Sequence, residues 1–245
     1  MQTLRLFLFS FFLCYCVFAG NSLYAQDYFA KVRTADSLFK QRKYTESFQL
    51  FEEVLTKDKY FTYRMLLQMA YIKEGMDDYA SALYYLNVYY ANNPEQKVLD
   101  KISELASKYK LKGYRPNDVE YLMALYRQNQ VILLTSIFSI FLLFLVYLIY
   151  RKLKHKDILY PAIALSFAVM IFFLLFNYYG IDIKKGIIKN EKIFLMNAPS
   201  AGADLLQTLQ KGDCVLVTDE TDVWYKVKWE EQEAYIRKSN VYLVE

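Results

Sequence analysis

The pattern of residues 41–59, QRKYTESFQLFEEVLTKDK, recurs in residues 75–94, GMDDYASALYYLNVYYANNP. In both stretches a tyrosine is followed three positions later by a small residue and then, four positions further on, by a large apolar one. In the segment before each, Ala35 matches Ala70, and every matched pair is 35 residues apart. A repeat of this length, with apolar residues at helical spacing, predicts pairs of helices that stack on their neighbours.

This pattern resembles the tetratricopeptide repeat (TPR) family, whose period is about 34 residues. Two units are expected, over residues 28–61 and 62–96, followed by a helix over residues 95–110 that caps them in a TPR domain of residues 27–112. The apolar face of that capping helix is formed by Val98, Ile102, Leu105 and Tyr109. The resemblance implies a groove lined by the first helix of each unit, with the candidate residues Val32, Asp36, Phe39, Leu67, Tyr71 and Glu74.

The start of the chain has the features of an export signal. Residues 1–5 are short and basic, residues 6–18 are an apolar core, and small residues up to Ala25 offer a cleavage site. We therefore expect a signal peptide over residues 1–25, with an uncleaved N-terminal anchor as the alternative.

Two uncharged apolar runs follow the helical repeats. Residues 131–150 and 158–179 are each long enough to cross the roughly 30 Å hydrocarbon core of a bilayer as a helix. They predict two transmembrane helices, the first preceded by a juxtamembrane helix over residues 117–130. The loop between them, residues 151–157, is basic and is expected to face the cytoplasm. Its topology-determining residues are Arg151, Lys152, Lys154 and Lys156.

The export signal and the basic loop indicate the same topology. They predict a multi-pass protein of the inner (cytoplasmic) membrane, with the segments before and after the two runs on the periplasmic, or extracytoplasmic, side.

After residue 186 the pattern changes to short alternating strands separated by turns. The turn LQKGD, the strand WYKVKW and the closing AYIRKSNVYLV resemble bacterial SH3-like (SH3b) domains, and imply an SH3b domain over residues 186–245. The expected fold class is therefore multidomain: an all-α TPR superhelix, a two-helix transmembrane hairpin and a small all-β SH3-like barrel. The candidate surface residues of the barrel are Tyr225, Trp229 and Tyr235.

The residues favour no catalytic chemistry. The one histidine of the chain, His155, lies in the loop expected in the cytoplasm, so the exported segments have no histidine to act as base for a serine or cysteine nucleophile. Removal of the signal peptide would leave Cys214 as the one cysteine, and one cysteine with one histidine cannot form the usual zinc site. There is no phosphate-binding GxxxxGK[ST] motif. The net charge of +4 comes from scattered lysines, which indicates no nucleic-acid partner. We expect a non-enzyme without cofactor or metal.

The whole order of segments resembles the E component of the Bacteroides aerotolerance (Bat) proteins, and the stretch MAYIKEG…YASALYYLNVYY carries much of the likeness. The resemblance implies envelope partners, among them von Willebrand A-domain proteins, and a role in stress tolerance or assembly. The function expected is a membrane-anchored scaffold that presents TPR and SH3b modules outside the cytoplasm. The alternative is a tether or sensor that binds peptidoglycan through the SH3b domain.

Overall fold

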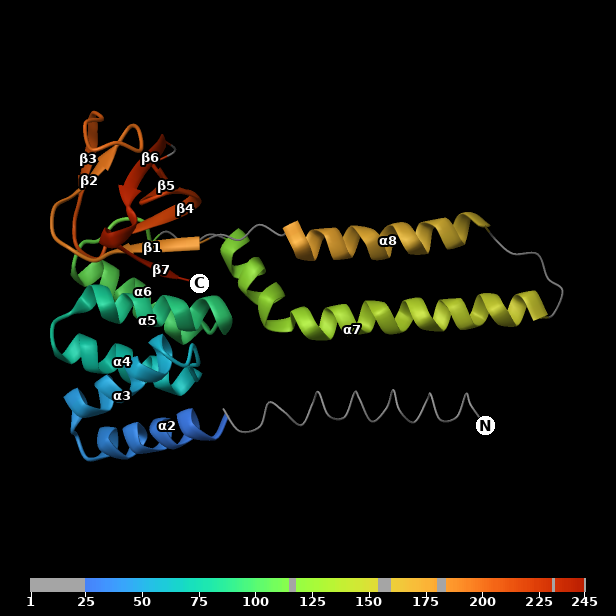
Figure 1. Ribbon diagram of the computed structural model, residues 1–245, viewed down its shortest axis with the longest axis horizontal. Helices are drawn as coiled ribbons and strands as arrows, with labels where there is room; N and C mark the ends of the chain where they lie inside the picture. The colour runs from blue at the N-terminus through green and yellow to red at the C-terminus, as the bar shows by residue number, and fades with distance from the viewer. Residues whose placement is uncertain (1–24, 115–117, 154–159, 180–183, 231, 245) are drawn as a thin grey trace. The chain divides into compact units, whose positions relative to one another are not determined.

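A computed structural model describes residues 25–114, 118–153, 160–179, 184–230 and 232–244. The expected signal peptide and most of the expected basic loop, including Lys154 and Lys156, lie outside the described residues. The chain divides into two compact units, and the boundary lies inside helix α5, between Tyr89 and Tyr90. Figure 1 shows the helices of the first unit in blue and cyan and the strands of the second in orange and red.

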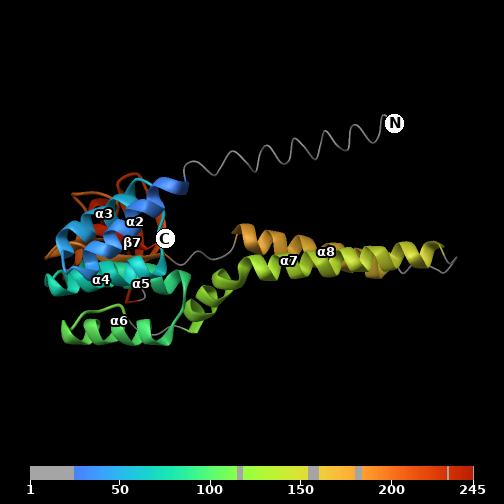
Figure 2. The same cartoon turned by 90° about the horizontal axis from the view of Figure 1, so that it is seen from below.

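Between residues 25 and 114 the structure has five helices, which Figures 1 and 2 label α2 to α6. Their bounds are Ala25–Lys40 (α2), Tyr44–Thr56 (α3), Tyr63–Gly75 (α4), Tyr79–Asn92 (α5) and Gln96–Lys108 (α6). The position of the unit boundary places α6 in the second unit. On α6, Val98, Ile102 and Leu105 are buried, as its helical spacing predicts, and Tyr109 just after it is half-buried.

The 35-residue repeat is present in the backbone hydrogen bonds as well as in the sequence. After α2, Arg42 adopts a left-handed conformation with φ of 62°, and after α4 the equivalent Asp77 does so with φ of 60°. Arg42 N donates to Phe39 O, and Asp77 N donates to Glu74 O, at 2.9 and 3.0 Å. The same turn therefore ends the first helix of both pairs, because a left-handed residue closes a helix by satisfying its last carbonyls.

Small residues bring the helices of each pair together. Ala35, Ser47, Ala70 and Ala82 are all buried. The hydroxyl of Ser47 on α3 donates to the carbonyl oxygen of Ala35 on α2 at 2.8 Å, which a larger residue at either position would prevent. Large side chains fill the space that remains, so that Phe51, Leu66 and Leu83 are fully buried in the core of the first unit.

Seven strands in the second unit form one antiparallel sheet with the order β3-β2-β6-β5-β4-β1-β7. Their bounds are Lys184–Ile188 (β1), Ile193–Met196 (β2), Leu205–Leu209 (β3), Cys214–Thr221 (β4), Trp224–Trp229 (β5), Gln232–Arg237 (β6) and Val241–Val244 (β7), with a 3-10 turn at Lys238–Asn240. One face carries an apolar core that includes Ile188, Leu195, Val227 and Ile236.

Along the chain, α6 is followed by two long helices and then by the strands of the sheet. The two helices are α7, over Asp118–Leu153, and α8, over Tyr160–Tyr179. They touch where the rings of Phe141 and Phe167 meet edge to face at 5.1 Å. Within the described residues, Gln128–Leu148 of α7 is long and apolar enough to cross a membrane, judged by length and composition alone, with a mean hydropathy of 2.8. Among the described side chains of α8, Ser166–Leu175 forms a shorter apolar stretch.

The fold class expected from the sequence is wrong. In place of a TPR superhelix, the described residues form a region of five helices, and in place of a transmembrane hairpin they contain one helix that is long and apolar enough to cross a membrane. In place of a small SH3-like barrel there is a seven-stranded sheet whose order leaves β3 and β7 as separate edges. Strand β1 was not predicted, and it begins before residue 186, where the SH3b domain was expected to start.

Candidate functional site

The six candidate groove residues lie on the two helices that begin the repeated pairs. Val32, Asp36 and Phe39 are on α2, and Leu67, Tyr71 and Glu74 are on α4. Leu67 is 39% and Tyr71 57% exposed, and the other four are half-buried. We call these six residues the α2–α4 face.

Contacts between α2 and α4 show that the two helices run in the same direction along this face. Tyr28 at the start of α2 stacks on Tyr60, just before α4, with ring centroids 4.2 Å apart. Further along, Arg64 Nε lies 3.9 Å from Asp36 Oδ1. At the far end the rings of Phe39 and Tyr71 meet at 5.7 Å. The face is therefore a parallel pair of helix surfaces with one ion pair at its middle and aromatic rings at both ends.

Tyr44 completes an aromatic triangle at one end of the α2–α4 face. Its ring lies 5.3 Å from that of Phe39 and 5.9 Å from that of Tyr71, both edge to face. Partial burial and a hydrogen bond with Tyr71 raise the pKa of the Tyr44 hydroxyl above its ordinary value. This triangle gives the face a preformed apolar surface with hydroxyl groups at its rim.

Sequence reasoning missed part of the exposed apolar surface around this face. Phe29 on α2 and Tyr63 on α4 are 45% and 44% exposed. Tyr63, Leu67 and Tyr71 recur every four residues, which is the spacing of one helix face. That spacing could have identified Tyr63 as a member of the same stripe.

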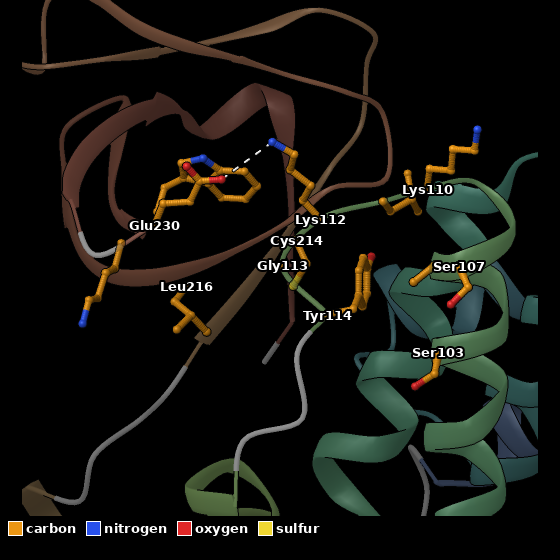
Figure 3. A pocket seen from close by; sticks show the side chains of 13 residues that line it. Ser103, Ser107, Lys110, Lys112, Gly113, Tyr114, Cys214, Leu216 and Glu230 are labelled. Atoms are coloured by element: carbon orange, nitrogen blue, oxygen red, sulfur yellow. Dashed lines mark ion pairs between the residues drawn. The ribbon is translucent and has the colours of Figure 1, made fainter.

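A cavity of about 1170 Å³ lies in the second unit, beside the end of α6 and strands β4 and β5 (Figure 3). Tyr114, Leu216 and Trp229 supply its apolar wall, and Ser103 and Ser107 of α6 line the other side. At its mouth Lys112 Nζ lies 3.6 Å from Glu230 Oε1, and both side chains are more than half exposed.

The three candidate residues of the sheet differ in their placement. Tyr235 on β6 is half-buried and lies opposite Met196 and Lys226 of the neighbouring strands. Tyr225 is also half-buried, packs against the sheet core, and has Lys238 Nζ 5.3 Å from its ring centre.

Trp229 was expected on the surface and is instead buried, with 7% of its surface exposed. Its indole Nε1 donates to Gln207 Oε1 at 2.7 Å, so its polar atom is satisfied inside the domain. It therefore belongs to the core of the sheet, and a small part of its surface lines the cavity.

Of the four topology-determining residues, Arg151 and Lys152 belong to the end of α7, and Arg151 is half-buried. Within the described residues there is no group of three or more His, Cys, Asp or Glu side chains that could hold a metal ion. Cys214 is buried at the start of β4.

No protein-family model matches the chain, and no curated protein matches it. The resemblances to TPR, SH3b and Bat proteins therefore stay predictions from the residues that carry them.

Proposed function

We propose that this chain is a non-enzymatic, membrane-anchored scaffold that binds partner proteins through the α2–α4 face outside the cytoplasm. The partner it fits is a peptide segment with an apolar anchor residue, because the face offers exposed rings and an exposed leucine around the Arg64–Asp36 ion pair.

The observation that carries the proposal is the preformed aromatic triangle beside exposed Leu67. Packing of Phe39, Tyr44 and Tyr71 on one another holds Tyr71 in place although more than half of it faces solvent. A ring that is already ordered loses little conformational freedom when a partner covers it, and this favours binding.

The membrane part of the proposal rests on Gln128–Leu148 of α7 and on the expected export signal. The apolar segment is long enough to anchor the chain, and a signal over residues 1–25 would send the helical region out of the cytoplasm. An anchored face meets other membrane proteins at a raised effective concentration, so that weak contacts suffice.

The resemblance to the Bat group supports envelope proteins with von Willebrand A domains as the partners, and an envelope stress or aerotolerance complex as the setting. The six residues of the α2–α4 face include no nucleophile paired with a base, and this supports a binding role for the face rather than catalysis.

The proposal is tested by cross-linking in intact cells, capture of the full chain from detergent, and identification of bound proteins by mass spectrometry. We expect von Willebrand A-domain membrane proteins to be recovered with the parent chain and lost with the double variant Leu67→Asp, Tyr71→Asp. Met76→Asp is the matched control, because Met76 is 58% exposed, close to the exposure of Tyr71, and lies just past the end of α4, outside the face.

Equal recovery with the double variant and the parent would remove the face from the proposal. Recovery of muropeptides in place of proteins would instead favour the alternative, a wall-binding tether that acts through the sheet.

A further inference from the structure

Residues 111–114, which we call the strap, join the end of α6 to the sheet across a long gap in sequence. The amide of Cys214 donates to the carbonyl oxygen of Lys112 at 3.0 Å, and the hydroxyl of Tyr114 donates to the carbonyl oxygen of Gly212 at 2.7 Å. The strap therefore contacts the turn that begins β4, about 100 residues later in the chain.

One carboxylate holds both sides of this contact. Asp213 is 3% exposed, and its Oδ1 accepts from the amide of Lys112 while its Oδ2 accepts from the amide of Gln210, each at 2.8 Å. A buried carboxylate is costly unless its oxygens are hydrogen-bonded. Release of the strap would leave one oxygen of Asp213 without the Lys112 amide, so the contact is specific rather than incidental.

The backbone of the strap also fits its place closely. Gly113 has φ of +88°, a conformation that other residues rarely adopt, and a Cβ atom there would overlap the carbonyl oxygen of Cys214. Only glycine permits the strap to approach β4 at this point.

Three residues separate the strap from the first residue of α7, Asp118. The first strand of the sheet begins at Lys184, shortly after α8 ends at Tyr179. Hydrogen bonds of about 3 Å cannot join groups on opposite sides of a hydrocarbon layer about 30 Å thick. We infer that the strap is an integral part of the sheet's fold, so that α6, the strap and the whole sheet occupy one aqueous compartment, and the chain between them enters and leaves the membrane on the same side.

This inference takes the presence of a membrane from the proposed function. It concerns only the strap and the sheet, which precede and follow α7 and α8 in the sequence. The proposed function depends on Leu67 and Tyr71, which the strap does not use. Loss of partner capture and loss of the strap contact are therefore separate outcomes.

The ion pair between Lys112 of the strap and Glu230, next to β5, allows a direct test on the full chain in its membrane (Figure 3). A water-soluble carbodiimide joins an amine to a carboxylate only when they touch, and the new amide is found by peptide mass spectrometry. We expect a Lys112–Glu230 cross-link within one chain. Mixing isotope-labelled and unlabelled chains distinguishes it from a link between two chains.

The chain contains its own positive control. Lys226 Nζ lies 2.8 Å from Glu233 Oε1 inside the β5–β6 hairpin, so reagent is added until this pair couples. Absence of the Lys112–Glu230 link in a sample where Lys226–Glu233 is coupled would overturn the inference. Lys112→Arg keeps the positive charge but removes the reactive amine, and should abolish only the first link. Gly113→Ala should also abolish it, by displacing the strap.

A second measurement determines on which side of the membrane the strap and the sheet lie. Lys110→Cys, next to the strap, and Val223→Cys, in the β4–β5 turn, place thiols at exposed positions, and the parent chain sets the background. We expect both to react with a membrane-impermeant maleimide in spheroplasts, or neither to react before lysis. Reaction of one without the other would overturn the inference.

Discussion

The two units of this chain are assembled from contacts of very different reach. In the first unit, Ser47 bonds to Ala35, 12 residues away, and the turn at Arg42 recurs at Asp77. In the second, Lys112 bonds to Asp213, 101 residues away, and β1 lies between β4 and β7. Local contacts form with little loss of chain entropy, whereas distant ones are formed only after a long loop has been closed. The first unit can therefore be read from its sequence one helix pair at a time, and the second cannot.

The chain offers a way to follow the second unit separately. Its two tryptophans, Trp224 and Trp229, are both buried in β5. Tryptophan fluorescence therefore reports on the sheet alone, while far-ultraviolet circular dichroism reports on the helices of both units.

The largest expected effects come from emptying the core of either unit. Phe51 and Ile236 are both fully buried, and we expect Phe51→Ala to cost about 3–5 kcal/mol and Ile236→Ala about 2–5 kcal/mol in the free energy of unfolding. Urea unfolding is followed by both signals. Phe51→Ala should shift the circular dichroism transition and leave the tryptophan transition in place, and Ile236→Ala should shift the tryptophan transition. If either variant shifted both transitions equally, the two units would unfold as one.

A smaller effect is expected at the hydrogen bond between helices in the first pair. Ser47→Ala removes the donor to the Ala35 carbonyl, and we expect a loss of about 0.5–1.5 kcal/mol in the urea unfolding of the helices. Ala82 occupies the equivalent position of the second pair and is also buried, so Ala82→Ser is the matched comparison.

If the second helix pair packs like the first, Ala82→Ser should lower the free energy of unfolding little or not at all, because the added hydroxyl can bond as that of Ser47 does. A strong destabilisation by Ala82→Ser would show that the two helix pairs pack differently.

The smallest effect is a pH dependence confined to the strap. Burial of the Tyr114 hydroxyl, with the nearby Cys214 and Asp213 as further causes, raises its pKa well above the ordinary value of 10.0. Below pH about 10 the folded and unfolded states both keep the proton. Above it the unfolded state loses the proton first, so stability should fall as pH rises towards the folded pKa.

Tryptophan-detected urea midpoints at increasing alkaline pH measure this effect. Tyr114→Phe should be less stable at neutral pH, because it loses the hydrogen bond to Gly212, and should flatten the alkaline decline. Tyr235→Phe controls for the removal of a phenol elsewhere in the sheet. An undiminished decline in Tyr114→Phe would assign the pH dependence to another group.

Most of the helical region could be predicted from the sequence. The 35-residue period located the helix pairs, and the spacing of Val98, Ile102 and Leu105 located the buried face of α6. These are local patterns that each helix carries within its own residues. The candidate groove residues could be assigned to one surface for the same reason, since position on a helix face follows from spacing.

The sheet was predicted less well. Strands β4 and β5 were visible as alternating residues, but β1, with the sequence KKGII, does not alternate and was missed. The burial of Trp229 could not be predicted either, because it depends on Gln207 from β3, 22 residues away. A strand's alternation predicts two faces without saying which of them is covered.

The sequence by itself determined the helix pairs, the repeat that relates them and the apolar segment of α7, because each of these depends on residues close together along the chain. Only the tertiary structure decided that seven strands form one open sheet, that Trp229 lies in its core, and that Asp213 fastens the strap to it. Those features depend on hydrogen bonds between segments that are far apart in the sequence. A local pattern of side chains cannot predict which distant segments will pair.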